Sequence, residues 1–145
     1  MKFIKSIYDS ETGTSYVILQ HLGKKFVGEA HVHPEDKDNM SEFAGCEYAE
    51  IRATIKALKY ERKIAKNKAD QALDFIKSCK CYSNYDNNSE TAKVIARQAY
   101  KRVKRVNDLT DEINKLMREL SKKINRHARM VKVFERKKNM SKEDK

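Results

Sequence analysis

Alternating apolar and polar positions mark the first part of the chain as β structure. Residues 25–33 alternate strictly, with Phe26, Gly28, Ala30 and Val32 on one face and with Glu29, His31 and His33 on the other. Two earlier segments, 3–9 and 16–22, are rich in β-branched, aromatic and aliphatic residues, and short polar or Gly-containing turns separate the three. The pattern predicts a three-stranded antiparallel meander over residues 1–33 whose apolar face needs a cover.

Beyond Pro34 the apolar residues recur every three or four positions, as they do along one face of a helix. A first helix is predicted over residues 39–79, with Asn39 and Glu42 as its starting signal. Its expected seam is Ala44, Tyr48, Ile51, Ile55, Leu58, Ala65, Ala69, Ala72 and Ile76.

A second helix is predicted over residues 88–136, with the same Asn-x-x-Glu signal at Asn87 and Glu90. Leu109 and Leu116 widen its heptad-like seam. The expected seam itself is Ala96, Ala99, Val103, Val106, Thr110, Ile113, Met117, Leu120 and Ile124.

These elements predict an α+β protein, an antiparallel three-stranded β-meander followed by two long antiparallel helices. We expect one domain over residues 1–136 and a disordered basic tail over residues 137–145. A helix of about 38 residues is about 57 Å long, whereas a seven-residue strand spans about 23 Å. Because so small a sheet cannot cover both apolar stripes, we expect the chain to assemble as a dimer or a higher oligomer.

Composition narrows the classes of protein to which the chain can belong. Of 145 residues, 37% are charged, one is Pro, four are Gly and three are Cys, which excludes collagen-like and disulfide-scaffold proteins. Neither a membrane span nor a secretory signal is evident, so we expect an intracellular protein with reduced thiols. The net charge is +11, and residues 89–145 hold eighteen Lys/Arg against eight Asp/Glu, so the last third of the chain should attract anions.

Metal and catalytic motifs are weak. His31 and His33 share a strand face, and Cys79 and Cys81 share a loop, but nothing in the sequence joins the two pairs into a zinc site. Cys46 lies inside a predicted helix without an evident base, and neither a phosphate-binding loop nor a nucleophile elbow occurs. We therefore expect a protein that is not an enzyme and that holds neither a metal nor another cofactor.

One region combines aromatic, amide and basic side chains that suit a nucleotide. Rings can stack on a base, Asn side chains can pair with its edge, and guanidinium groups can hold phosphates. Arg52 could join from a partner chain, and an ordinary basic helix flank beside a capped loop remains the alternative. The candidate ligand-binding residues are Tyr82, Asn84, Tyr85, Asn88, Arg97, Tyr100, Lys101 and Arg105.

The segment from Phe26 to Asp36 (FVGEAHVHPED), with Ser41, Gly45 and the run from Tyr48 to Ala53 (YAEIRA), resembles the first-described Thoeris anti-defence family of phage proteins. Members of that family act in the host bacterial cytoplasm as sponges. They bind cyclic ADP-ribose isomers of the glycocyclic type, the signals that TIR-domain enzymes of Thoeris immunity make from NAD, without degrading them. The resemblance implies a pocket shared between protomers of a homodimer and, in some members, a hexamer built as a trimer of dimers. Some members also hold the cyclic trinucleotides of CBASS immunity at a separate site.

Two other functions fit the same residues. A phage DNA- or RNA-binding protein would use the basic last third of the chain, although no helix-turn-helix, zinc finger or RNA-recognition motif is present. A structural helical protein that masks a partner protein would form the hairpin and the oligomer and would bind no small molecule.

Overall fold

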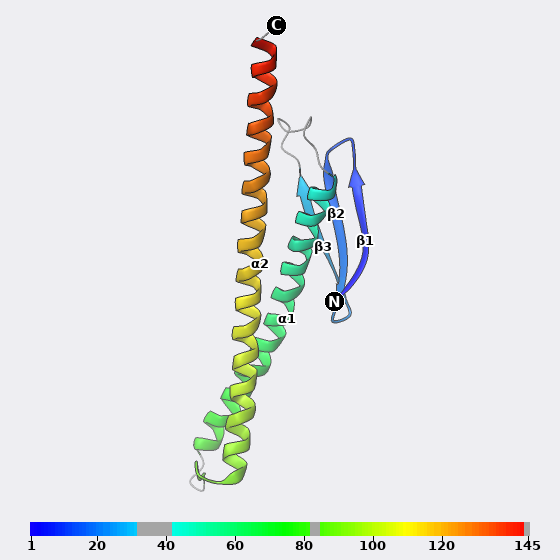
Figure 1. Cartoon of the computed structure of the whole chain (residues 1–145). Helices are drawn as coiled ribbons and strands as arrows, with labels where there is room; N and C mark the ends of the chain where they lie inside the picture. Colours follow the sequence, from blue (N-terminus) through cyan, green and yellow to red (C-terminus); the bar gives the residue numbers. More distant parts are fainter. Residues whose placement is uncertain (32–41, 82–84, 144–145) are drawn as a thin grey trace. The chain divides into compact units, whose positions relative to one another are not determined.

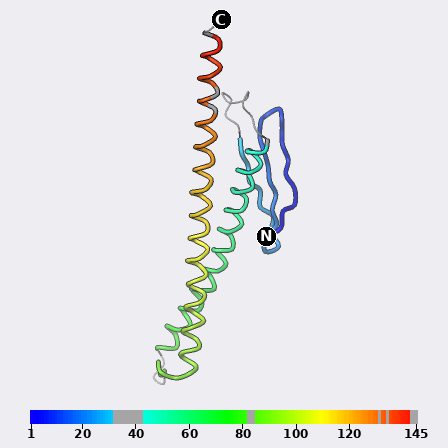
Figure 2. Tube along the Cα trace, viewed as in Figure 1, coloured from blue at the N-terminus to red at the C-terminus, as the bar shows by residue number. Residues whose placement is uncertain are grey.

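The computed structural model describes residues 1–31, 42–81 and 85–143. Strands that are consecutive in the sequence pair antiparallel, in the order β1-β2-β3 (Figure 2). This confirms the α+β fold that the sequence predicted, an antiparallel meander followed by two long helices. The elements of this part of the chain (Figure 1) are β1 (Lys2–Asp9), β2 (Thr14–His21), β3 (Lys24–His31), α1 (Glu42–Lys80) and α2 (Glu90–Glu143).

The ends of the second helix differ from the sequence prediction. Asn87 does not begin it, because α2 starts at Glu90 and the backbone N–H of Ala92 donates to Ser89 Oγ at 3.1 Å, which makes Ser89 the N-cap. At the other end α2 continues to Glu143, so residues 137–143, which we predicted to be disordered, are helical. This segment lacks Gly and Pro and is rich in Lys, Met and Glu, which favour helix.

The chain divides into two compact units. The sheet unit comprises Met1–Ala57 and Lys115–Lys145, and the hairpin unit comprises Leu58–Asn114. Both helices pass through both units, and the three strands belong to the sheet unit. The single domain that the sequence predicted over residues 1–136 stays a prediction.

In the sheet unit, α1 supplies the cover that the apolar face of the sheet needs. Val17 and Leu19 of β2 and Ala30 of β3 form a buried cluster with Ala49 and Ala53 of α1. Along β3 the burial alternates as predicted, with the face that carries Gly28 and Ala30 buried and the intervening residues exposed. The first turns of α1 therefore close the core of this unit.

Small residues let α1 lie unusually close to the sheet. A methyl group placed on Gly28 would overlap the carbonyl oxygen of Ala49 and would lie 2.6 Å from the backbone nitrogen of Ala53. Similarly, a methyl group on Gly45 would meet the side chain of Ser15, which is itself buried. Only glycine fits where two backbones approach this closely, so Gly28 fixes the distance between β3 and α1.

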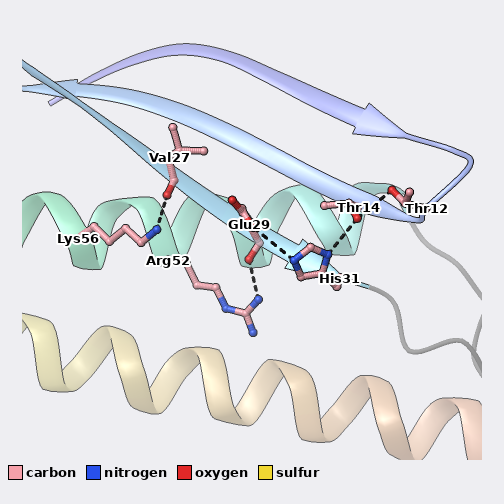
Figure 3. Close-up of polar contacts among 7 residues, drawn as sticks. All are labelled: Thr12, Thr14, Val27, Glu29, His31, Arg52 and Lys56. Carbon is pink, nitrogen blue, oxygen red and sulfur yellow. Dashed lines mark hydrogen bonds and ion pairs between the residues drawn. The ribbon is translucent and has the colours of Figure 1, made fainter.

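Cationic side chains of α1 close the outer edge of β3 (Figure 3). Arg52 Nη1 donates to the carbonyl oxygen of Glu29 at 2.7 Å, and Lys56 Nζ donates to the carbonyl oxygen of Val27 at 2.7 Å. Exposed strand edges present unpaired carbonyl groups to which another chain can pair. Two cationic side chains, one turn apart on α1, therefore bind two carbonyl groups of this edge.

A polar cluster joins α1 to the last part of α2 within the sheet unit. Tyr48 donates its hydroxyl proton to the carbonyl oxygen of Lys123 at 3.1 Å, and its ring meets that of His127 edge-on, with centroids 6.5 Å apart. The ammonium group of Lys123 forms an ion pair with Glu47. Burial and the nearby Glu47 carboxylate raise the pKa of Tyr48 above 10.0, and the hydrogen bond that Lys123 donates to Glu47 raises the pKa of Lys123.

This cluster predicts a loss of stability in alkali. A group whose pKa is higher in the folded protein stabilises the fold below its unfolded pKa, and that stabilisation disappears as the pH rises through the folded pKa. Replacing Tyr48 with Phe should cost about 1 kcal/mol at pH 8, or about 3 °C in Tm, because one hydrogen bond is lost. The Tm values of the wild type and Tyr48→Phe should converge as the pH rises above about 10. A difference that stays constant from pH 8 to pH 11 in thermal unfolding would contradict this account.

The buried seam of α2 agrees with most of the predicted one, including Leu109 and Leu116, and differs from it at three positions that are exposed. Leu109 is fully buried, whereas Met117 and Ile124, which we assigned to the seam, are 47% and 36% exposed, and Ala96 is also exposed. Neighbouring positions lie about 100° apart around a helix, so Leu109 and Leu116 lie nearer the core than Thr110 and Met117. The buried and half-buried residues of this seam include Ala92, Ile95, Ala99, Val103, Val106, Leu109, Thr110, Ile113, Leu116 and Leu120.

Candidate functional site

Hydrogen bonds from two arginine side chains of α2 to α1 join the two helices of the hairpin unit. Arg102 Nη1 donates to the carbonyl oxygen of Lys68 at 3.3 Å. Arg105 Nη2 lies 2.5 Å from Glu61 Oε1, and this hydrogen bond raises the pKa of Arg105. These contacts set α1 and α2 side by side in antiparallel directions.

Between the helices of this unit lies a groove of about 240 Å³, which we call the interhelical groove. Phe75 projects into solvent at its rim, with 55% of its surface exposed. About one turn of α1 and two turns of α2 therefore contribute to one concave surface. The groove is lined by Gln71, Ala72 and Phe75 of α1 and by Ile95, Gln98 and Arg102 of α2.

The lining of the interhelical groove matches the three kinds of group that a nucleotide offers. The exposed ring of Phe75 can stack on a base, and stacking is tolerant of base identity. Gln71 and Gln98 each present an amide with two donors and an acceptor, which can pair with the edge of a base. Arg102 presents a guanidinium group that can bind a phosphate with two parallel hydrogen bonds. The combination suits a ligand with a purine and a phosphate.

The size of the interhelical groove bears on how a ligand would be held. Pockets that enclose small molecules have volumes of about 300–1,000 Å³, which is more than the 240 Å³ found here. A single chain therefore offers a nucleotide a partial site, and complete burial needs a further surface.

A second depression in the hairpin unit is larger but chemically less suited to an anion. Its volume is about 540 Å³. Its two carboxylates offset the charge of its two ammonium groups, so the lining has no net positive charge to attract a phosphate. The lining consists of Asp70, Leu73, Asp74, Ile76, Lys77 and Lys80, all from α1.

Of the loop residues predicted to bind the ligand, Tyr82 and Asn84 lie outside the described residues. Tyr85 is half-buried, and Asn88 is exposed. The backbone N–H of Asn88 donates to Asp86 Oδ1 at 2.9 Å, which stabilises the turn before α2.

The predicted residues of α2 are exposed, but they do not all lie on one side of the helix. Lys101 follows Gln98 by three positions and Arg105 follows it by seven, so both lie on the flank of the helix that carries Gln98. Tyr100, which is 69% exposed, lies two positions from both Gln98 and Arg102 and therefore about 200° around the helix from each. Arg97 is three positions before Tyr100 and lies on that outer face as well.

Two predicted arginines have partners in the structure. Arg105 is paired with Glu61, and Arg52, in the sheet unit, donates to the Glu29 carbonyl oxygen. Arg52 thus has a structural task at the edge of β3. To bind a phosphate, each would have to share or exchange its present acceptor.

Sequence reasoning missed most of the interhelical groove. Gln71, Phe75, Gln98 and Arg102 were not predicted as site residues. A signal was present, because Gln71 and Phe75 are four positions apart and flank the predicted seam residue Ala72. Gln98 and Arg102 have the same spacing. Residues four apart lie on one helix face, so each pair forms one wall.

A hydrogen-bonded chain at the end of the sheet has the residue types of a catalytic relay (Figure 3). Thr14 Oγ1 lies 3.0 Å from His31 Nδ1, and His31 Nε2 lies 3.3 Å from Glu29 Oε2. Thr12 Oγ1 donates to Thr14 Oγ1 at 2.9 Å. Thr14 is only 3% exposed, so its hydroxyl is shielded from a substrate, and the chain instead ties β2 to β3.

The His and Cys residues that the sequence offered as possible zinc ligands are not brought together in the described part of the chain. His33 lies outside it, both ring nitrogens of His31 have the partners just given, Cys79 is half-buried and Cys81 is exposed. Within residues 1–31, 42–81 and 85–143, no group of three or more His, Cys, Asp or Glu side chains is placed to hold a metal ion.

Comparison of the chain with protein-family models, with curated proteins and with solved structures finds no match. In the described segments, no helix has both the length and the apolar character needed to cross a membrane.

Proposed function

We propose that this protein is a phage anti-defence sponge that binds and sequesters, without degrading it, a cyclic ADP-ribose isomer made by TIR-based Thoeris immunity. The observation that carries the proposal is the interhelical groove, which places Phe75, two amide side chains and Arg102 on one surface. The resemblance of residues 26–53 to the Thoeris anti-defence family supplies the class of ligand. A cyclic ADP-ribose isomer has a purine and a pyrophosphate, the groups that this lining suits.

The proposed binding mode uses both walls of the groove. The adenine stacks on Phe75, and the amides of Gln71 and Gln98 pair with its edge. The pyrophosphate lies against Arg102, within reach of Lys101 on the same flank of α2. Arg105 contributes when its guanidinium group, which has five donors, binds the ligand alongside Glu61.

A second copy of the chain completes the site in this proposal. The groove is smaller than a pocket that encloses a small molecule, and the exposed Arg97 and Tyr100 lie on the opposite side of α2. A homodimer, or a trimer of dimers, brings the outer face of one α2 over the groove of another. CBASS cyclic trinucleotides are the other class of ligand that the resemblance suggests.

Sequestration explains how such a protein acts without catalysis. The free signal must fall below the concentration that activates the immune effector, so the Kd must lie below that threshold and the protein must be abundant. The helix backbones that carry these side chains are already ordered before binding, so only the side chains lose freedom, which favours a low Kd.

Thermal unfolding with cyclic ADP-ribose isomers tests the proposed function. At a ligand concentration of 100 times Kd, binding stabilises the fold by about 2.7 kcal/mol, which raises the Tm by about 5–10 °C. Mass spectrometry of the ligand released by heating should recover the cyclic isomer intact. The absence of a shift with every isomer would support a masking protein instead, and recovery of linear ADP-ribose would identify an enzyme.

A further inference from the structure

The last part of α2 carries a row of cations in the sheet unit, with Glu119 on the same side of the helix. Seven Lys or Arg side chains follow one another at steps of three or four residues between positions 115 and 136, a spacing that keeps them on one face of the helix. We call this row the basic stripe. It consists of Lys115, Arg118, Lys122, Arg126, Arg129, Lys132 and Arg136.

The basic stripe is exposed and is not engaged by the described part of the chain. All seven residues are exposed, and none of their side chains forms a hydrogen bond or an ion pair with another described residue. Lys123, between them, is turned toward Glu47 and is not part of the stripe. Residues 115–136 contain eight Lys/Arg against Glu119 and Glu135, a net charge of +6.

The dimensions of the basic stripe suit a regular row of phosphates. The 21 steps from Lys115 to Arg136 extend about 32 Å along the helix, with about one cation per turn of 5.4 Å. At 3.4 Å per base pair, a nucleic acid duplex presents about nine base pairs of backbone over that length. Several phosphates therefore come within reach of the stripe at the same time.

The flanks of the stripe favour phosphates over a lipid surface. A helix that lies in a membrane interface needs an apolar face that can enter the acyl chains. Over residues 115–126, Leu116 and Leu120 are half-buried within the sheet unit instead of exposed. In the same stretch Met117 and Ile124 are exposed, but they are two side chains seven positions apart, whereas insertion needs a continuous apolar face.

We propose that the basic stripe binds the phosphate backbone of duplex nucleic acid independently of base sequence. Its side chains neutralise phosphates and release counterions, which supplies the free energy of binding. The stripe lies in the sheet unit and the interhelical groove lies in the hairpin unit, so this activity does not depend on the sponge function.

Fluorescence anisotropy of the full chain with labelled 20-base-pair DNA and RNA duplexes, at 50 to 200 mM salt, tests the proposal. If the stripe contacts five phosphates, the log–log slope of affinity against salt should be about −4.5. The variant Arg118→Gln/Lys122→Gln/Arg126→Gln/Arg129→Gln should reduce the slope by about 3–4. We expect its Kd at 50 mM salt to rise about tenfold or more.

A charge-matched control separates the stripe from general net charge. The variant Lys59→Gln/Lys63→Gln/Lys66→Gln/Lys68→Gln removes the same four charges from exposed positions of α1 and should change the Kd less than threefold. Circular dichroism should show unchanged helix content in both variants, and the stripe variant should bind cyclic ADP-ribose isomers as the wild type does.

Three outcomes would overturn the proposal. The wild type fails to bind either duplex at 50 mM salt, the two variants lose affinity equally, or the wild type binds vesicles containing phosphatidylserine and neither duplex. Binding to both duplexes, with the loss confined to the stripe variant, supports it whether or not the sponge function holds.

Discussion

Replacing Gly28 with Ala should lower the Tm by about 10 °C. The new methyl group would overlap the carbonyl oxygen of Ala49 in α1, and backbone atoms cannot turn away as a flexible side chain can. Either α1 moves off the sheet or β3 bends, and overpacking of this kind costs about 3 kcal/mol. For a chain of 145 residues that loss corresponds to the stated change in Tm, measurable by calorimetry or circular dichroism.

Gly23→Ala is the matched control for Gly28→Ala. Gly23 has a φ of +74°, and a methyl group there would meet no atom within 4 Å, so the change tests backbone strain without a clash. It should cost about 1–2 kcal/mol, the penalty for placing an L-residue in the left-handed region. If Gly28→Ala is no more harmful than Gly23→Ala, the close approach of β3 and α1 does not determine the stability of the sheet unit.

Substitutions in the interhelical groove should act on function mainly by weakening the binding of the ligand. Stacking is worth about 1–3 kcal/mol per base, so Phe75→Ala should raise the Kd for a cyclic ADP-ribose isomer about tenfold or more. Arg102→Gln should raise it about 10–100-fold, because a hydrogen bond between charged groups is worth about 1.5–3 kcal/mol. Isothermal titration calorimetry measures both Kd values.

Leu73→Ala and Lys104→Gln are the controls for these two substitutions. Leu73 is an exposed apolar residue of α1, 42% exposed, that does not line the groove, and Lys104 is an exposed cation of α2 two positions after Arg102. Each should change the Kd less than threefold. Equal losses in the control and groove variants would show that the ligand, if bound, lies elsewhere.

The sequence was sufficient to predict the fold because its hydrophobic patterns are unambiguous. Strict alternation in residues 25–33 identified which face of β3 is covered, and the absence of Gly and Pro after Gly45 identified the long helices. The N-cap of α2 was predicted less well, because Asn87 and Ser89 are both good caps and only the fold shows that Ser89 is used.

The site was harder to predict because it depends on which residues of two helices meet. The predicted seam of α2 included Leu109, which is buried, but it also included Met117 and Ile124, which are exposed. Periodicity cannot separate two adjacent phases of a heptad when both contain apolar residues. Phe75 and Gln98 therefore became visible only when the helices were placed side by side.

The hydrogen bonds from Arg52 and Lys56 to β3 also limit how this protein can aggregate. Pairing of strands between molecules requires carbonyl and N–H groups that are not yet engaged, and at β3 two of the carbonyl groups are engaged by α1. The other edge is β1, whose residues 2–7 are exposed. A sheet that can be extended on one side only can join one other molecule through that side, and growth into a fibril then stops.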